Sequence, residues 1–498
     1  MRRTMLALLA ALVAVTPALA QEGPLEVAVD QAPVGLDPHL VTAFSSFVVL
    51  QNIYDGLVEF DADLNVQPAL ATSWEVSEDG LVYDLMLRDD VVFHNGRSMT
   101  AEDVVYSFER IMAEETGSPQ ASRLSQVASA EATGDHAVRF TLAAPFAPFL
   151  GNLSNLTVVP REVVEAEGDL QQVAVGTGPF MLDEVVPDTY VRLVANPDYY
   201  RAGQPMLAEL RFNVVPEAST RAAGLRTGTY HLLPDVDPAT AQTLQGASGV
   251  ELLQVQDLAY SLMGVNTTVA PFDDPRVRRA LNLAIDRDEI VTAVYFGNAV
   301  PGGPLSPGLD AWALDTSEFA CYAHDPAAAR ALLAEAGYPD GFELEILTFG
   351  TIKVVSDLAQ VLQAQLTEVG IDTTVNVAEF GTFVQDWRNS DFQAFVSLNG
   401  GNADPDGYLY RTFHSTGATN VYLYDSGTVD GLLDAGRTSV GDEARFEVYA
   451  DLQRVLACDG PVQHVAYATL FTGVRENVVG FQQMPTRGMR YLRETSLD

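Results

Sequence analysis

Lysine is almost absent from this chain of 498 residues, since Lys353 is the only one and arginine supplies the rest of the 28 basic residues. Asp and Glu number 67, which gives a formal net charge of −39. A field of this sign argues against nucleic acid and anionic membrane surfaces as partners. We interpret the charge as an acidic, well-solvated surface; a preference for cationic ligands is the alternative.

Catalytic and metal-binding motifs are also missing. The chain has no GxSxG, HExxH or P-loop sequence, and none of its seven histidines is paired with another His or Cys at metal-ligand spacing. We therefore predict that the protein is not an enzyme and uses no metal or cofactor. A secreted hydrolase with a carboxylate pair such as Asp404 and Asp406 is the remote alternative.

Long hydrophobic runs are confined to the first 20 residues. Arg2 and Arg3 precede an apolar segment at 5–15, and residues 18–20 (ALA) form a small-residue cleavage site, which together are typical of a signal peptide. No later run is long enough to cross a membrane, and no cysteine follows the cleavage site to carry a lipid. The mature chain is therefore predicted to be soluble and exported to the periplasm.

Cysteine is scarce as well. Cys321 and Cys458 are the only two, and in an exported protein they permit one disulfide. Two buried free thiols are the alternative.

The second half alternates strands with helices. Strands are predicted at 342–347, 371–377 and 392–398, with helices at 354–369 and 382–388 between them. Such units form a parallel sheet with right-handed crossovers. The first half begins with a strand at 25–29, and Thr100 with Asp103 is placed to open a helix.

Residues 267–287 (TTVAPFDDPRVRRALNLAIDR) predict a helix with both ends marked. Asp274 can cap it, with Pro275 at its first position. Asp286 then caps a second helix, with Glu289 in capping-box register. This segment resembles one found in periplasmic solute-binding proteins of peptide-type ABC transporters, solute-binding protein family 5. Further segments share the resemblance: 51–60 (QNIYDGLVEF), 68–80 (PALATSWEVSEDG), 85–96 (LMLRDDVVFHNG), 100–105 (TAEDVV), 175–180 (VGTGPF) and 196–200 (NPDYY).

The resemblance implies a two-lobed α/β periplasmic-binding-protein fold, class II-like and cluster C, with an extra subdomain in the first lobe. The expected division is lobe I at 21–50, 170–270 and 478–498, the inserted subdomain at 51–169, and lobe II at 271–477. It also implies capture of a short peptide by hinge closure and delivery to inner-membrane permease subunits, by a monomer. The alternatives are a non-peptide solute (an opine-like conjugate, an oligosaccharide or a metal chelate) in the same architecture.

Ligands of open parallel sheets bind beyond the carboxyl ends of the strands. This rule selects two loops, 348–353 with Lys353 and 399–406 with Asp404 and Asp406. The resemblance implies an aspartate for a ligand amine three residues before the Asp-Pro step, where this chain has Gly401. We expect one of the two later aspartates to substitute, and Lys353 to meet a ligand carboxylate; solvated turn and surface charges are the alternatives.

The resemblance also places segment 42–47 at the facing wall of the cleft. Aromatic walls there would be Phe44 and Phe47, unless these pack in the core. The full set of predicted ligand-binding residues is Phe44, Ser45, Phe47, Tyr260, Lys353, Asn399, Gly401, Asn402, Asp404, Asp406 and His414.

Overall fold

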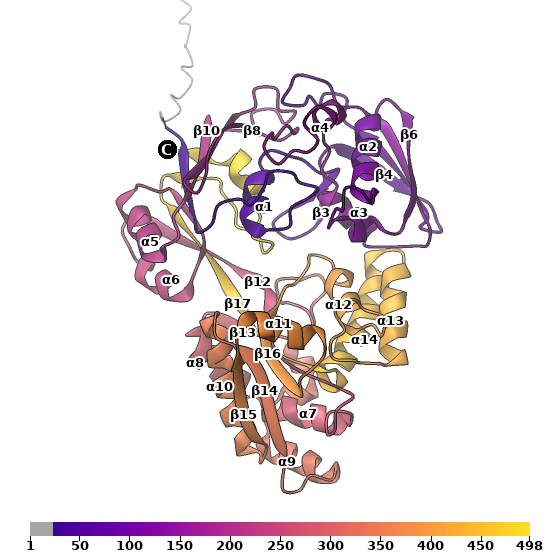
Figure 1. Cartoon of the computed structure of the whole chain (residues 1–498), viewed down its shortest axis with the longest axis vertical. Coiled ribbons are helices and arrows are strands. Elements are labelled where there is room, and N and C mark those ends of the chain that lie inside the picture. The colour runs from indigo at the N-terminus through magenta and orange to yellow at the C-terminus, as the bar shows by residue number, and fades with distance from the viewer. Residues whose placement is uncertain (1–22) are drawn as a thin grey trace, which may run out of the picture.

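The computed structural model describes residues 23–498, so the predicted signal peptide lies outside the described residues. An eleven-stranded sheet runs through the molecule (Figure 1). Its order is β15 (Asp372–Ala378), β14 (Glu343–Phe349), β16 (Ala394–Asn399), β12 (Val250–Val265), β17 (Val462–Arg475), β11 (Leu232–Val236), β1 (Leu25–Val29), β10 (Glu209–Val214), β9 (Tyr190–Ala195) and β8 (Phe180–Val186), with β13 (Ala299–Pro301) beside β17.

The two long strands β12 and β17 connect two lobes. In lobe I, residues 250–256 of β12 pair with 469–475 of β17, and β17 also pairs with β11. In lobe II, residues 260–264 of β12 pair with 462–467 of β17, and β12 also pairs with β16. The antiparallel ladder is interrupted between Gln256 and Tyr260, because residues 257–259 face only Ala468 of β17. The Gln256 side chain donates to the carbonyls of Tyr467 and Ala468 at 2.8 and 2.7 Å, which satisfies backbone acceptors at this bulge.

Lobe I is built on the parallel strands β10, β1 and β11, with β9 and β8 added antiparallel at the edge. The end of the chain returns to this lobe, because Met489 and Leu492 are buried in the same core as Leu25 and Phe212. Its other elements are α1 (Phe44–Leu50), α5 (Ala218–Thr227), α6 (Pro238–Leu244), β18 (Val478–Val479), η5 (Arg490–Glu494) and β19 (Ser496–Leu497).

A smaller sheet with its own core, which includes Phe93, Phe140 and Phe149, lies beside lobe I. The predicted capping box is confirmed, because Thr100 and Asp103 exchange hydrogen bonds at the start of α2. The smaller sheet has the order β4 (Ala71–Val76), β5 (Val82–Leu87), β7 (Ala137–Leu142) and β6 (Val127–Gly134). The same part of the chain contains the separate strand pair β2 (Val58–Phe60) and β3 (Val66–Pro68), and α2 (Ala101–Met112), η1 (Ala121–Leu124), α3 (Phe149–Asn152), η2 (Leu153–Asn155) and α4 (Arg161–Glu167).

Lobe II contains the predicted parallel strands, because β14 pairs parallel with both β15 and β16. The predicted helix caps are also present: Asp274 accepts from the backbone of Arg276, and Asp286 from that of Glu289. The side chain of Glu289 accepts instead from Gln365 at 2.7 Å. The remaining elements are α7 (Pro275–Ala284), α8 (Arg287–Tyr295), η3 (Thr316–Glu318), η4 (Ala320–Tyr322), α9 (Pro326–Glu335), α10 (Lys353–Glu368), α11 (Phe380–Arg388), α12 (Asp406–Phe413), α13 (Gly427–Thr438) and α14 (Asp442–Asp459).

Cys321 and Cys458 form the disulfide that the sequence permits, so the alternative of two free thiols is wrong. The bond joins η4 to the last turn of α14. Among residues 23–498, no helix combines the length and apolar character needed to span a bilayer. The expected residue limits of the lobes stay a prediction, since β12 and β17 each contribute to both.

Candidate functional site

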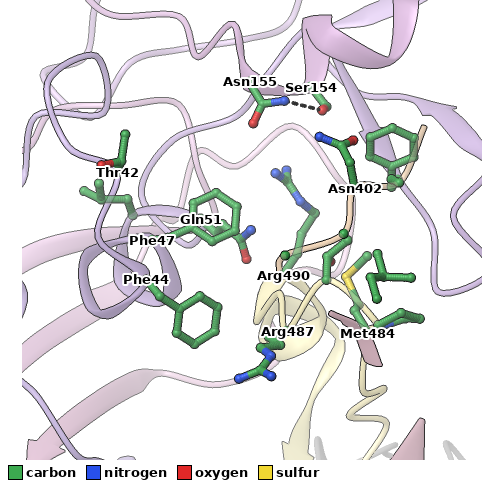
Figure 2. A pocket seen from close by; sticks show the side chains of 18 of the residues that line it. Thr42, Phe44, Phe47, Gln51, Ser154, Asn155, Asn402, Met484, Arg487 and Arg490 are labelled. Carbon is green, nitrogen blue, oxygen red and sulfur yellow. Dashed lines mark hydrogen bonds between the residues drawn. The ribbon is translucent and has the colours of Figure 1, made fainter. Parts of the chain in front are cut away.

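A cavity of about 440 Å³ lies between the lobes (Figure 2). Lobe I contributes residues from segment 38–60, and the smaller sheet with its loops contributes residues from 120–123 and 154–157. The bulge at 257–259, the loop 400–403 of lobe II and the C-terminal segment 484–490 complete the lining. The cavity therefore touches both lobes and the strands that join them, and its volume is in the range of small-ligand sites.

Helix α1 forms an aromatic wall of the cavity. Phe44 and Phe47 lie one turn apart on this helix, and both are 38% exposed. Figure 2 shows both rings on the same side of the cavity, facing the C-terminal segment. The alternative, that both rings are buried in the core, is therefore wrong. Ser45, predicted from the same segment, is not among the lining residues.

The bulge and the loop of lobe II meet closely beside the cavity. A Cβ built on Gly401 would lie 2.1 Å from the carbonyl oxygen of Leu258, so this close approach requires glycine. The missing Cβ at Gly401 thus allows the loop to approach the bulge. Asn402 lines the cavity as predicted, and its amide is visible in Figure 2.

Asp404 and Asp406 do not line the cavity. Asp404 makes two hydrogen bonds with the guanidinium of Arg445, at 2.8 and 3.0 Å, and Asp406 makes two of 2.9 Å with Arg437. The structure therefore does not place either carboxylate where it was expected, in contact with a ligand amine. Both carboxylates anchor the helices α13 and α14, because a buried carboxylate needs a fixed cation.

Four other predicted residues also lie away from the lining. Tyr260 is 1% exposed in the core of lobe II, where its hydroxyl accepts from the Asn399 amide at 2.9 Å. The Tyr260 phenol is kept neutral because burial raises its pKa. His414 is 8% exposed, and Thr416 donates to its ring. Lys353 forms an exposed ion pair with Asp357 at 2.6 Å.

Three arginines in the lining were missed by the sequence analysis: Arg123, Arg487 and Arg490. Arg487 makes ion pairs of 3.1 Å with Asp235 and 2.6 Å with Asp257, which tie the C-terminal segment to β11 and the bulge. The only sequence signal for the last two is the close spacing of Arg487, Arg490 and Arg493 near the end of an acidic chain, and Arg123 has no such signal.

Arg490 belongs to a buried cluster of charges beside the cavity. Its Nη1 lies 3.4 Å from Glu59 and 3.7 Å from Asp55. Glu59 is held more tightly by Arg493, at 2.7 and 2.8 Å, and by Arg201 at 2.8 Å. Burial raises the pKa of Asp55, and burial of Glu59 is outweighed by the arginines, which lower its pKa to about 2.

Two α/β lobes, joined by long strands with a bulge at the crossing and a cavity between them, define a two-lobed binding protein. Residues 65–420 match the family model "Bacterial extracellular solute-binding proteins, family 5 Middle". The chain belongs to this family of bacterial extracellular solute-binding proteins, which confirms the resemblance and the predicted fold class.

Two relatives extend the comparison over nearly the whole chain. A probable di/tripeptide-binding protein of Pseudomonas aeruginosa is 31% identical, and the alignment covers 96% of this chain and 96% of that protein. The heme-binding protein A of Haemophilus influenzae is 30% identical over 91% of this chain and 89% of that protein.

Two solved structures share the fold. HbpA2 of Haemophilus parasuis superposes with a TM-score of 0.87, at 28% identity over 96% of this chain and 100% of that one. The periplasmic binding protein DppA of Helicobacter pylori, in complex with the peptide STSA, gives a TM-score of 0.77 at 30% identity, over 95% and 98% of the two chains.

Proposed function

We propose that this protein captures a short peptide between its lobes and delivers it to the permease of an ABC importer. The observation that carries the proposal is the cavity itself, whose walls come from both lobes and from the strands that join them. The protein would act in the periplasm as a monomer, after removal of its signal peptide and without a lipid anchor. Permease subunits in the inner membrane would be its partners.

Closure of the lobes fits the strand geometry. The bulge at 257–259 weakens the β12–β17 ladder where the lobes meet, and hinge motions are absorbed at a few such residues. The difference in TM-score supports this reading. The value is 0.87 against HbpA2 but 0.77 against the peptide-bound DppA, although the identity to DppA is no lower. We infer that the arrangement of the lobes in the peptide-bound protein differs from the one described here, as closure around a ligand requires.

A peptide suits the cavity better than the other solutes that we considered. The Pseudomonas relative is named for binding di- and tripeptides. Of the three tryptophans, Trp74, Trp312 and Trp387, none lines the cavity, although stacked aromatics of this kind favour sugars. Within residues 23–498 no group of His, Cys, Asp or Glu is arranged to hold a metal. The relatives are binding proteins of transporters, which gives a hydrolase no support.

Calorimetric titration and thermal unfolding of the ligand-stripped protein test the proposal. The panel contains di- to pentapeptides, opines, oligosaccharides and nickel chelates. A ligand at 100 times its dissociation constant adds about 2.7 kcal/mol to the free energy of unfolding, which raises the midpoint. Phe47→Ala should weaken peptide binding, whereas Phe296→Ala, an exposed ring that does not line the cavity, should not. Absence of binding by every peptide, or hydrolysis of any peptide, would overturn the proposal.

A further inference from the structure

The charge of the cavity is opposite to the charge of the protein. The chain carries 67 acidic and 28 basic residues, yet the cavity is lined by Arg123, Arg487 and Arg490 and by a single carboxylate, Asp257. Asp257 is already paired with Arg487 at 2.6 Å. Two guanidinium groups, those of Arg123 and Arg490, therefore remain to act on a solute.

Arg490 keeps hydrogen-bonding capacity for a ligand. Both of its ionic contacts, to Glu59 and Asp55, are made by Nη1 and are longer than 3.3 Å. Within residues 23–498, its Nε and Nη2 have no hydrogen-bond partner. The Glu59 oxygens are held at shorter distances by Arg493 and Arg201, so Arg490 is the arginine that Glu59 holds least tightly. Figure 2 shows the Arg490 guanidinium extending between Gln51 and Asn402.

Arg123 lines the cavity from η1, an element separate from the C-terminal segment that contains Arg490. Its guanidinium forms no ion pair with any described residue, and the nearby Arg411 of lobe II adds a second positive charge. Burial first, and then Arg411, lower the pKa of Arg123. A cation that is partly withdrawn from water and lacks a partner is stabilised by an anion, which restores the lost hydration.

Among the described residues, the same lining offers no free carboxylate for an ammonium ion. The Oδ1 of Asp257 accepts from the backbone of Ala259 at 3.0 Å, and its Oδ2 accepts from Arg487. At Gly401 an aspartate cannot be accommodated, because its Cβ would lie 2.1 Å from the Leu258 oxygen. Asp404 is held by Arg445 outside the cavity.

We propose that the cavity selects acidic short peptides by their carboxylates, through Arg490 and Arg123, and does not read a free α-ammonium group. The apolar part of such a solute would pack on Phe44 and Phe47. This specificity rests on the proposed function, since it assumes that peptides bind between the lobes.

Three synthetic probes separate the two charges of a peptide: N-acetyl-Phe-Glu, Phe-Glu, and N-acetyl-Phe-Gln amide, which has no carboxylate. We expect N-acetyl-Phe-Glu to bind at least as tightly as Phe-Glu, and the amide to bind about tenfold more weakly or worse, as for a lost hydrogen bond to a charge. The affinity for the two acids should also fall as the salt concentration rises. Isothermal titration calorimetry measures all three.

Arg123→Gln should lower the affinity for N-acetyl-Phe-Glu by about tenfold and leave the amide unaffected. This variant breaks no ion pair, so it should fold even where Arg490→Gln, which enters the buried cluster, does not. The matched control is Arg139→Gln on β7, an exposed arginine paired with Asp84 and absent from the lining, which should change nothing.

The failures are distinguishable. Equal affinity for the amide and the acid, or binding that requires the free ammonium group, would overturn the carboxylate specificity and leave peptide capture standing. If neutral or basic peptides from the wider panel bind and the acidic probes do not, the carboxylate specificity is likewise overturned and peptide capture stands. Absence of binding by every peptide would overturn both proposals.

Discussion

The replacement Glu59→Gln tests the buried charge cluster that supports the cavity. The Glu59 side chain is 6% exposed and accepts hydrogen bonds from Arg493 and Arg201. Burial raises the pKa of this carboxyl group, but the arginines outweigh burial and lower it from 4.5 to about 2. That difference corresponds to about 3 kcal/mol of unfolding free energy at pH 7.

The pH dependence has a defined sign. Because the folded pKa lies below the unfolded value, the stabilisation is complete above 4.5 and is lost as the pH falls toward 2. Urea unfolding should therefore show wild type more stable than Glu59→Gln by about 3 kcal/mol at pH 7, and by roughly half as much at pH 3. Taking the difference between the two proteins removes the contribution of other carboxylates.

The control is Glu165→Gln, which breaks an exposed ion pair with Arg161 and should have little effect at either pH. A difference between wild type and Glu59→Gln that stays constant from pH 7 to pH 3 would refute the reasoning. A variant as stable as wild type at pH 7 would also refute it, because the ion pairs with the arginines would then add nothing to the free energy of unfolding.

Two further replacements test the packing of the hinge and of lobe II. Gly401→Ala places a Cβ 2.1 Å from the Leu258 oxygen and should cost about 1–3 kcal/mol in thermal unfolding and weaken peptide binding. Gly400→Ala, whose Cβ would meet nothing within 4 Å, is the matched control for stability, and equal losses of stability in the two variants would contradict the close approach. Replacing Cys321 and Cys458 by serine opens a bridge across 137 residues and should lower the free energy of unfolding by about 2–5 kcal/mol. An unchanged urea midpoint would show that the bond adds no stability.

Local patterns carried the sequence predictions that the structure confirms. The caps at Asp274 and Asp286 and the parallel strands of lobe II depend on residues a few positions apart, so their signals survive in the sequence. Helix α1 was missed because Ala43 provides no side-chain cap and the helix has only 7 residues. Segment 42–47 was still identified as a wall of the cleft, from the family resemblance.

The binding groups could not be predicted in the same way, because they depend on distant partners. Asp404 is taken by Arg445, 41 positions later, and no local pattern reports that pairing. Conversely, Arg123 and Arg490 lie far apart in the sequence but line the same cavity. The sequence shows a glycine at position 401, but the Leu258 carbonyl that requires it is brought close only by the fold, where the bulge meets the loop.

The most direct test of the central claim is a crystal structure of the protein with the peptide that binds most tightly in the titrations. We expect the peptide in the cavity between the lobes, in contact with Phe47 and Arg490, and the lobes rotated toward each other about the bulge at 257–259. A peptide bound elsewhere on the surface, or lobes that keep the arrangement described here around an empty cavity, would contradict it.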